Sequence, residues 1–208
     1  MRCTIDHLTV VAPTLDSGAD HVLRALGVAP GPGGEHPRMG THNLLLKLGE
    51  AAFIEVIAPN PAAPHPGRPR WFALDDAAAL GAPRLAAWVA RTDDLGACPR
   101  DLLEQLGPIE TMTRGVREWL ITIPADGALP FGGALPMLIE WQSPRARAGA
   151  GLPEGGCALA TLGLRHPQPQ RLAAMLALAG LDDPVEIAAG APGLWADIVT
   201  PQGLRRLA

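Results

Sequence analysis

The 208-residue sequence has no tyrosine, few aromatic residues (4%) and only three cysteines, which lie far apart. Three cysteines cannot all pair within one chain, and no Cys-x-x-Cys occurs, so a reducing, cytoplasmic location is predicted. No run reaches the ~18 apolar residues of a membrane helix, and no membrane partner is therefore expected. Asp6 and His7 interrupt the apolar start of the chain, which is not typical of a signal peptide.

Charge is also scarce, since charged residues make up 18% of the chain and the net charge is −4. This balance offers no basic face for phosphate groups, so no nucleic-acid partner is predicted. The sequence has no Gly-x-Ser-x-Gly nucleophile elbow, no phosphate-binding loop and no Gly-x-Gly-x-x-Gly fingerprint. Serine hydrolases and the common nucleotide-binding classes are thus not indicated.

A repeated pattern is present instead. An apolar run, a polar turn and an amphipathic helical pattern that ends near a glycine occur three times, in residues 5–28, 84–107 and 158–181. The spacing of the leucines predicts helices, and the glycines are suited to end them. An apolar strand with one acid closes each repeat: "FIEVIAPN", "LIEWQSPR" and "WADIVTPQ". The acids are Glu55, Glu140 and Asp197.

Each repeat is interpreted as a β-α-β-β-β unit, which gives an α+β fold. Such units bury one sheet face under a helix and form curved half-barrel sheets around a cavity. Paired units at 1–60 and 84–142 are predicted to form one domain over residues 1–142. A third, shorter unit at 157–208 is expected to pack on it, covering an edge or forming a homodimer face. Residues 71–80 are expected to form a connecting helix.

The sequence resembles the vicinal oxygen chelate superfamily, and specifically its glyoxalase-like-domain branch. The resemblance is carried by "IDHLTVVAPTLD", "GGEHPRMGTHNLLLKLG" followed by "FIEVIAP", "LPFGGALPMLIEW" and "LWADIVTPQG". Superfamily members include glyoxalase I, extradiol dioxygenases, antibiotic-resistance proteins and epimerases. What the resemblance implies is a metal in the barrel that two adjacent substrate oxygens chelate.

The resemblance places His7, Glu55 and Glu140 at three of the four ligand positions. One imidazole and two carboxylates could hold Zn²⁺, Ni²⁺, Mn²⁺ or Fe²⁺. The fourth position falls at Leu85, which cannot be a ligand. Two interpretations therefore remain: a metal at these three residues, or a metal-free cavity in which they bind the substrate or each other.

Strand alternation suggests the substrate contacts. In "THNLLLKL", Thr41 and Asn43 share one face and are expected to point into the cavity, while His42 lies on the apolar face. His36 is expected on a loop at the rim, where binding residues concentrate. Arg117 lies on a strand of the second unit, and there it would suit a carboxylate or phosphate of the substrate.

Two functions are consistent with these features. The first is a glyoxalase-like enzyme of the lyase, isomerase or dioxygenase type, acting on a small molecule with adjacent oxygens. Glu55 and Glu140 would be its catalytic carboxylates, with a divalent metal as Lewis acid. The second is a protein of the same fold that binds or sequesters a small molecule without chemistry, which the missing fourth ligand favours.

Overall fold

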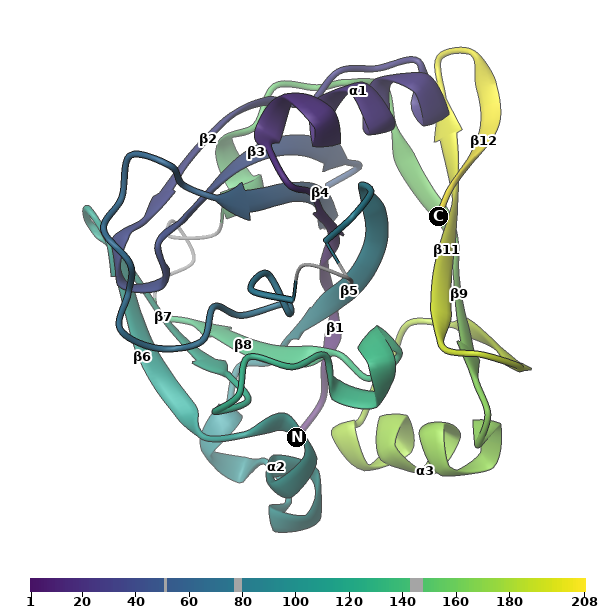
Figure 1. Cartoon of the computed structure of the whole chain (residues 1–208). Coiled ribbons are helices and arrows are strands. Elements are labelled where there is room, and N and C mark those ends of the chain that lie inside the picture. Colours follow the sequence, from purple (N-terminus) through teal and green to yellow (C-terminus); the bar gives the residue numbers. More distant parts are fainter. Residues whose placement is uncertain (51, 77–79, 143–147) are drawn as a thin grey trace.

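The computed structural model describes residues 1–50, 52–76, 80–142 and 148–208. Its main feature is a curled, eight-stranded sheet with the order β2-β3-β4-β1-β5-β8-β7-β6 (Figure 1). The strands are β1 (Thr4–Val11), β2 (Gly31–His36), β3 (Thr41–Leu48), β4 (Ala52–Pro59), β5 (Arg84–Arg91), β6 (Ile109–Arg114), β7 (Arg117–Thr122) and β8 (Met137–Trp141).

The sheet consists of two β-α-β-β-β halves that meet at its centre. In the first half α1 (Leu15–Leu26) follows β1, and β4 returns parallel to β1. In the second half α2 (Arg100–Leu106) follows β5, and β8 returns parallel to β5. Strands β1 and β5 pair antiparallel and join the halves. This arrangement confirms the predicted α+β fold with curved half-barrel sheets.

Local sequence signals explain the ends of the first helix. The hydroxyl of Thr14 accepts a hydrogen bond from the backbone N–H of Ser17, and the Ser17 hydroxyl in turn accepts from the N–H of Thr14. This reciprocal cap satisfies two otherwise unpaired donors. Gly27 ends the helix in the left-handed conformation with φ 73°, as predicted.

A second, four-stranded sheet packs outside the curled one. It contains β9 (Ala158–His166), β10 (Val185–Ala189), β11 (Gly193–Thr200) and β12 (Gly203–Leu207) in the order β10-β9-β11-β12, with α3 (Pro169–Ala179) after β9. The β-α-β-β-β element order recurs, but here the first strand lies between the second and the third, whereas β1 and β5 each lie at the edge of their own half. Leucines and isoleucines of this sheet share one core with the outer face of β1 and β5.

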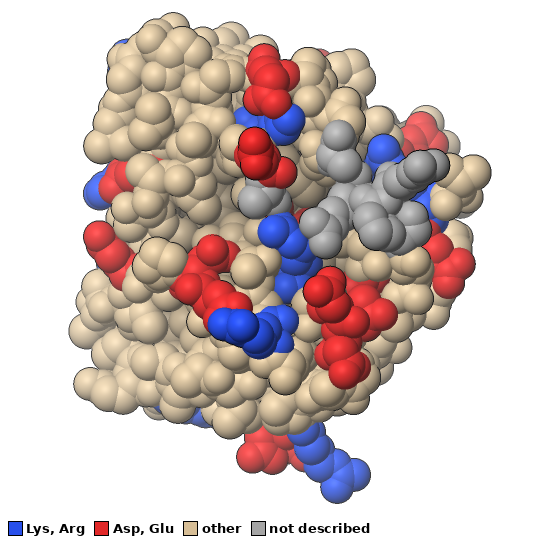
Figure 2. Space-filling model, turned by 180° about the vertical axis from the view of Figure 1, so that it is seen from behind, with Lys and Arg blue, Asp and Glu red and all other residues tan. Residues whose placement is uncertain are grey.

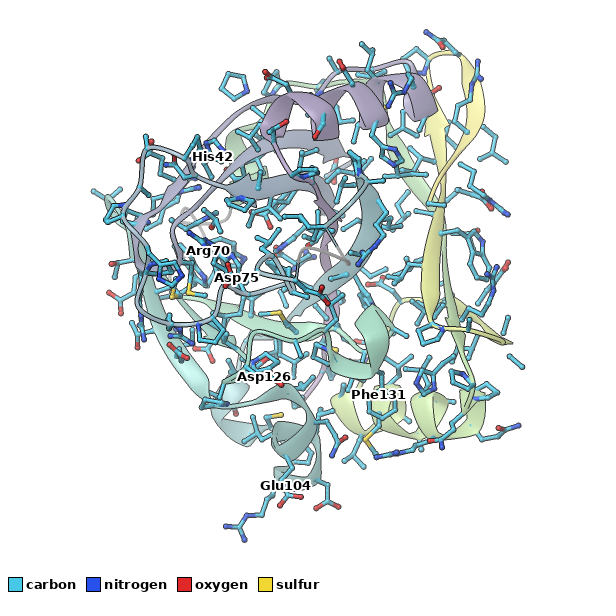
Figure 3. All side chains as sticks on the ribbon, in the orientation of Figure 1. His42, Arg70, Asp75, Glu104, Asp126 and Phe131 are labelled. Atoms are coloured by element: carbon cyan, nitrogen blue, oxygen red, sulfur yellow. The ribbon has the colours of Figure 1, made fainter. Side chains whose placement is uncertain are left out.

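The connection between β4 and β5 crosses the opening of the curled sheet (Figure 1). Residues 71–76 form turns rather than the start of the predicted helix, and residues 77–79 lie outside the described part. Phe72 and Ala73 have positive φ angles, 57° and 54°. The side chain of Arg70 pairs with that of Asp75 over this opening (Figure 3) and donates to the carbonyl of Gly40 at 3.2 Å. The bond to Gly40 fastens the connection to the first half, and the pair with Asp75 holds Arg70 in place within the connection.

Short 3₁₀ turns complete the described chain: η1 (Pro37–Met39), η2 (Leu95–Ala97), η3 (Pro130–Gly133) and η5 (Ala148–Gly151). None of the helices in the described residues combines the length and hydropathy that a membrane span requires. On the face opposite to that of Figure 1, basic side chains lie among acidic ones (Figure 2).

Candidate functional site

A cavity lies inside the curled sheet, between its two halves. It is narrow in the free protein, with a volume of about 30 Å³ that lies well below the usual range of small-molecule sites, so a ligand would need the lining side chains to move apart. The chain has five tryptophans and three phenylalanines, and five of these eight rings line the cavity. The lining residues are His7, His36, Asn43, Phe53, Glu55, Trp71, Phe72, Arg114, Trp119, Ile121, Ile139 and Trp141.

A buried histidine between two carboxylates forms the polar part of the wall. His7 Nδ1 lies 2.7 Å from Asp6 Oδ1, and His7 Nε2 lies 3.4 Å from Glu55 Oε2. All three side chains are buried. The pairing of β1 with β5 shifts register between Ile5 and His7. This irregularity explains how Asp6, adjacent in sequence, can reach the same histidine, since a regular strand would turn it away.

Asn43 extends this network toward β2. Its Nδ2 donates to Glu55 Oε1 at 2.5 Å, and its Oδ1 accepts from the backbone N–H of Gly34 at 2.7 Å. A side chain at Gly33 would place its Cβ 2.2 Å from Asn43 Oδ1. The glycines of this strand therefore allow its backbone to approach the amide closely.

The network determines the charge of the groups. Burial alone would lower the pKa of His7, but the hydrogen bonds and charges of Asp6 and Glu55 outweigh it and raise the pKa to about 9. Burial alone would raise the pKa of Glu55. The hydrogen bond and charge of His7, assisted by His36 and Asn43, lower it to about 2. At neutral pH the pair is therefore an imidazolium beside a carboxylate.

His36 is buried at the end of β2, not on a loop as the sequence suggested. Burial, and then the charges of Arg114, His7 and His42, lower its pKa to about 4 against an opposing effect of Glu55. Its ring is thus neutral at pH 7.

The hydroxyl of Thr41 anchors two rings of the cavity wall. It lies 3.2 Å from His36 Nδ1 and accepts from Trp71 Nε1 at 3.3 Å. Thr41 and Asn43 therefore both point inward, as strand alternation indicated. Thr41 is a support for two lining residues, since it is not itself part of the cavity lining.

The structure does not bring Glu140 to this network. Glu140 shares a face with Leu138, which packs into the core beneath the helices. Its Oε2 accepts from the backbone N–H of Leu95 in η2 at 2.7 Å, and its Oε1 accepts from Gln142 at 2.9 Å. The inner face of β8 instead carries Ile139 and Trp141.

His7, Glu55 and Glu140 consequently do not form the metal site that the resemblance implied. His7 and Glu55 come from the first half, while the inner face of β5 carries the apolar Ala87 and Val89. Among the described residues, no group of three or more His, Cys, Asp or Glu side chains is placed to hold a metal ion. A site with three protein ligands, as at many catalytic zinc centres, is not assembled by His7, Glu55 and Glu140.

Several lining residues were not identified from the sequence. Arg114 lines the cavity and Arg117 does not, although the two face each other across the β6–β7 hairpin. Trp141 also lines the cavity, and its Nε1 donates to Asp6 at 3.0 Å. Phe53 stacks on His7 with ring centroids 4.7 Å apart. Because Phe53 lies two residues before Glu55 on the same strand, strand alternation could have placed it on the same inner face.

Two β-α-β-β-β half-barrels around an aromatic-lined cavity define the class of this protein. The chain belongs to the glyoxalase-like domain family, whose family model matches residues 5–180. No curated protein matches the sequence.

Three solved structures are similar to this chain, and the first of them supports the assignment of the fold. The crystal structure of a hypothetical protein from Staphylococcus aureus is similar over 98% of this chain and 93% of that chain, with a TM-score of 0.68 and 16% identity. Methylmalonyl-CoA epimerase from Mycobacterium tuberculosis matches 68% of this chain and 89% of its own, with a TM-score of 0.42 and 21% identity. A methylmalonyl-CoA epimerase in complex with methylmalonyl-CoA and NH4+ matches 71% of this chain and 99% of its own, with a TM-score of 0.45 and 13% identity.

Proposed function

We propose that this protein is a small-molecule enzyme of the isomerase or lyase type, which moves a proton beside a carbonyl group in the cavity. The observation that carries the proposal is the buried chain Asp6–His7–Glu55–Asn43 in the wall of an aromatic cavity. Buried charges are costly to the fold unless they are paired. Strongly perturbed groups in a cleft are typical of sites that carry out chemistry.

In this proposal His7 is the electrophile. Asp6 orients the ring through Nδ1, which leaves the N–H at Nε2 directed toward Glu55 and the cavity. At 3.4 Å the contact with Glu55 is longer than an ordinary hydrogen bond. A substrate carbonyl oxygen would accept this N–H. The imidazolium would then stabilise the negative charge that develops on that oxygen, without any step through a metal.

Glu55 is the proposed base. Its Oε1 is held by Asn43, so Oε2 is the oxygen that can take a proton from the carbon beside the carbonyl. Once the substrate accepts the N–H of His7, Glu55 loses part of the interaction that depresses its pKa and becomes more basic. For an α-hydroxy ketone, return of the proton to the neighbouring carbon, with the hydroxyl proton passing to the former carbonyl oxygen, completes an isomerisation. Return to the same carbon from the same side regenerates the substrate and is observed only as exchange with solvent.

A second candidate function is binding without turnover. One observation favours it: both oxygens of Glu55 already face partners, and its pKa of about 2 makes it a weak base in the free protein. General bases act best when their pKa lies near the working pH. In this case the network would fix the shape and polarity of a binding cavity.

The test is solvent exchange at carbon, followed by proton NMR in D2O. The panel contains 2-oxo acids, α-hydroxy ketones and 1,2-dicarbonyl compounds, with phenylpyruvate among them. We expect faster exchange of at least one compound with the wild type, and a loss of roughly 100-fold or more in Glu55→Gln. Glu140→Gln is the matched control, because it makes the same chemical change outside the cavity.

Exchange that Glu55→Gln leaves unchanged would contradict the assigned base. If the wild type binds members of the panel and accelerates none of them, the enzyme proposal fails and the binding function is supported.

A further inference from the structure

We infer that Arg114 binds the carboxylate of the ligand, so that the cavity takes a small anion with a flat apolar group. The inference takes from the proposed function only that the ligand binds in this cavity, and it does not depend on whether Glu55 acts as a base. Two observations carry it: an unpartnered guanidinium nitrogen in the wall, and the concentration of aromatic rings around it.

Arg114 lies at the end of β6, beside the tight turn that leads into β7. Its Nη1 is buried, and no protein atom in the described residues forms a hydrogen bond with it. A Cβ added to Gly34 would lie 2.9 Å from this nitrogen. The guanidinium therefore rests against the β2 backbone in space that only a glycine leaves open.

The charges near the cavity leave this arginine without a counter-ion in the described part of the chain. Glu55 pairs with His7, and Asp6 contacts both His7 and Arg91. Glu110, the acid on the same strand as Arg114, is occupied by two other arginines. Arg68 binds it through two hydrogen bonds of 2.6 and 2.7 Å, and Arg38 is its second partner.

Arg114 as a whole is partly exposed, but the burial of its Nη1 without a partner still carries a desolvation cost. Burial and the charge of Arg117 lower the pKa of Arg114, and Glu55 opposes this effect. A planar anion such as a carboxylate would accept two parallel hydrogen bonds from a guanidinium. The ligand itself is the natural source of such an anion, because the arginine lines the cavity.

The aromatic rings of the cavity indicate which chemical group the rest of the ligand carries. Trp119 and Trp141 pack with centroids 5.4 Å apart, and Trp71 approaches His36 edge-on at 5.1 Å. Such walls favour a flat, apolar group that can stack on the rings. Arg114 belongs to the second half of the sheet, whereas His7 and Glu55 belong to the first. A ligand that engages both groups would therefore bridge the two halves.

The test uses phenylacetate, its uncharged amide phenylacetamide, and acetate, with binding followed by tryptophan fluorescence and calorimetry. We expect phenylacetate to bind best, because acetate lacks the ring and the amide lacks the charge. Arg114→Met should weaken phenylacetate binding by roughly 10- to 100-fold and leave phenylacetamide nearly unchanged. The control is Arg117→Gln, which removes the same charge from the opposing hairpin position outside the cavity lining.

Arg114→Met also distinguishes a ligand-binding role from a structural one. An unpartnered guanidinium contributes little to stability, so the melting temperature of the variant should stay equal to or above that of the wild type. A clear fall in melting temperature would instead indicate that Arg114 holds the hairpin. Equal binding of phenylacetate and phenylacetamide, equal losses in both arginine variants, or no saturable binding of phenylacetate up to about 10 mM would each overturn the inference.

Failure here is distinguishable from failure of the proposed function. Glu55→Gln should keep or increase the preference for phenylacetate, because it removes a negative charge that acts on Arg114. A protein that prefers carboxylates but exchanges no carbon-bound proton would keep this inference and lose the enzyme proposal.

Discussion

The imidazolium of His7 should give the protein a pH-dependent stability that Glu55→Gln reduces. The pKa of His7 rises from 6.5 to about 9 on folding, because two carboxylates hold the charged ring despite its burial. The stabilisation is therefore fully present below pH 6.5 and is lost as the pH rises through about 9. The pKa of Glu55 falls from 4.5 to about 2. Its contribution is present above pH 4.5 and is lost as the pH falls through about 2.

The magnitude follows from these pKa values. Each pKa unit corresponds to about 1.4 kcal/mol, so His7 contributes up to about 3 kcal/mol that disappears by about pH 10. The change in the pKa of Glu55 reports largely the same ion pair, and the two contributions are not added. In Glu55→Gln only Asp6 still holds the charged ring, and roughly half of this pH dependence should remain.

The assay is urea unfolding, followed by tryptophan fluorescence at pH 6.5 and at about pH 10. The chain has no tyrosine, and Lys47 is its only lysine, so few other groups titrate in this interval. Burial raises the pKa of Cys3 to about 12 and also raises the pKa values of Cys98 and Cys157, so these thiols ionise first in the unfolded chain. They add a loss of stability above about pH 9 that is common to the wild type and the variants, and the comparison therefore rests on the difference between the proteins. Glu140→Gln should show the same pH dependence of stability as the wild type. Identical pH dependence in the wild type and in Glu55→Gln would refute the ion pair.

Three further variants test the surroundings of the site. Asn43→Ala should lower the free energy of unfolding by about 1–3 kcal/mol in urea titrations, because a buried carboxylate and a backbone N–H lose their shared partner; an unchanged midpoint would contradict this network. Glu140→Gln should cost only about 1 kcal/mol, through the backbone N–H of Leu95, and leave phenylacetate binding unchanged; a loss of binding would return Glu140 to the site. Asp75→Asn should weaken the contact with Arg70, and therefore speed proteolysis between β4 and β5 and weaken phenylacetate binding. Equal proteolysis rates in the variant and the wild type would show that this pair does not hold the connection.

Much of the first half could be predicted from strand periodicity. Alternation placed Thr41 and Asn43 on the inner face, and the position of Glu55 relative to Phe53 was also available from it. His7 was identified through the family resemblance, and the structure brings it next to Glu55. Thr41, Asn43 and Glu55 lie on β3 and β4, which pair without any shift of register, so their side chains alternate regularly.

The remaining features depend on information that periodicity does not contain. Strand β2 contains three glycines and a proline in six residues, a composition that suggests a loop. The irregularity at Asp6 is a property of the pairing between β1 and β5. On β8, Leu138 and Ile139 are both buried, so hydrophobicity alone could not decide which face Glu140 shares. The orientation of Glu140 is determined by tertiary packing.

A crystal structure of the protein with phenylpyruvate is the most direct test of this account. We expect the carboxylate of the ligand on Arg114, its ring among the tryptophans, and its carbonyl oxygen within hydrogen-bond distance of His7 Nε2. A ligand bound outside the cavity, or a divalent metal held by His7 and Glu55 between protein and ligand, would contradict it.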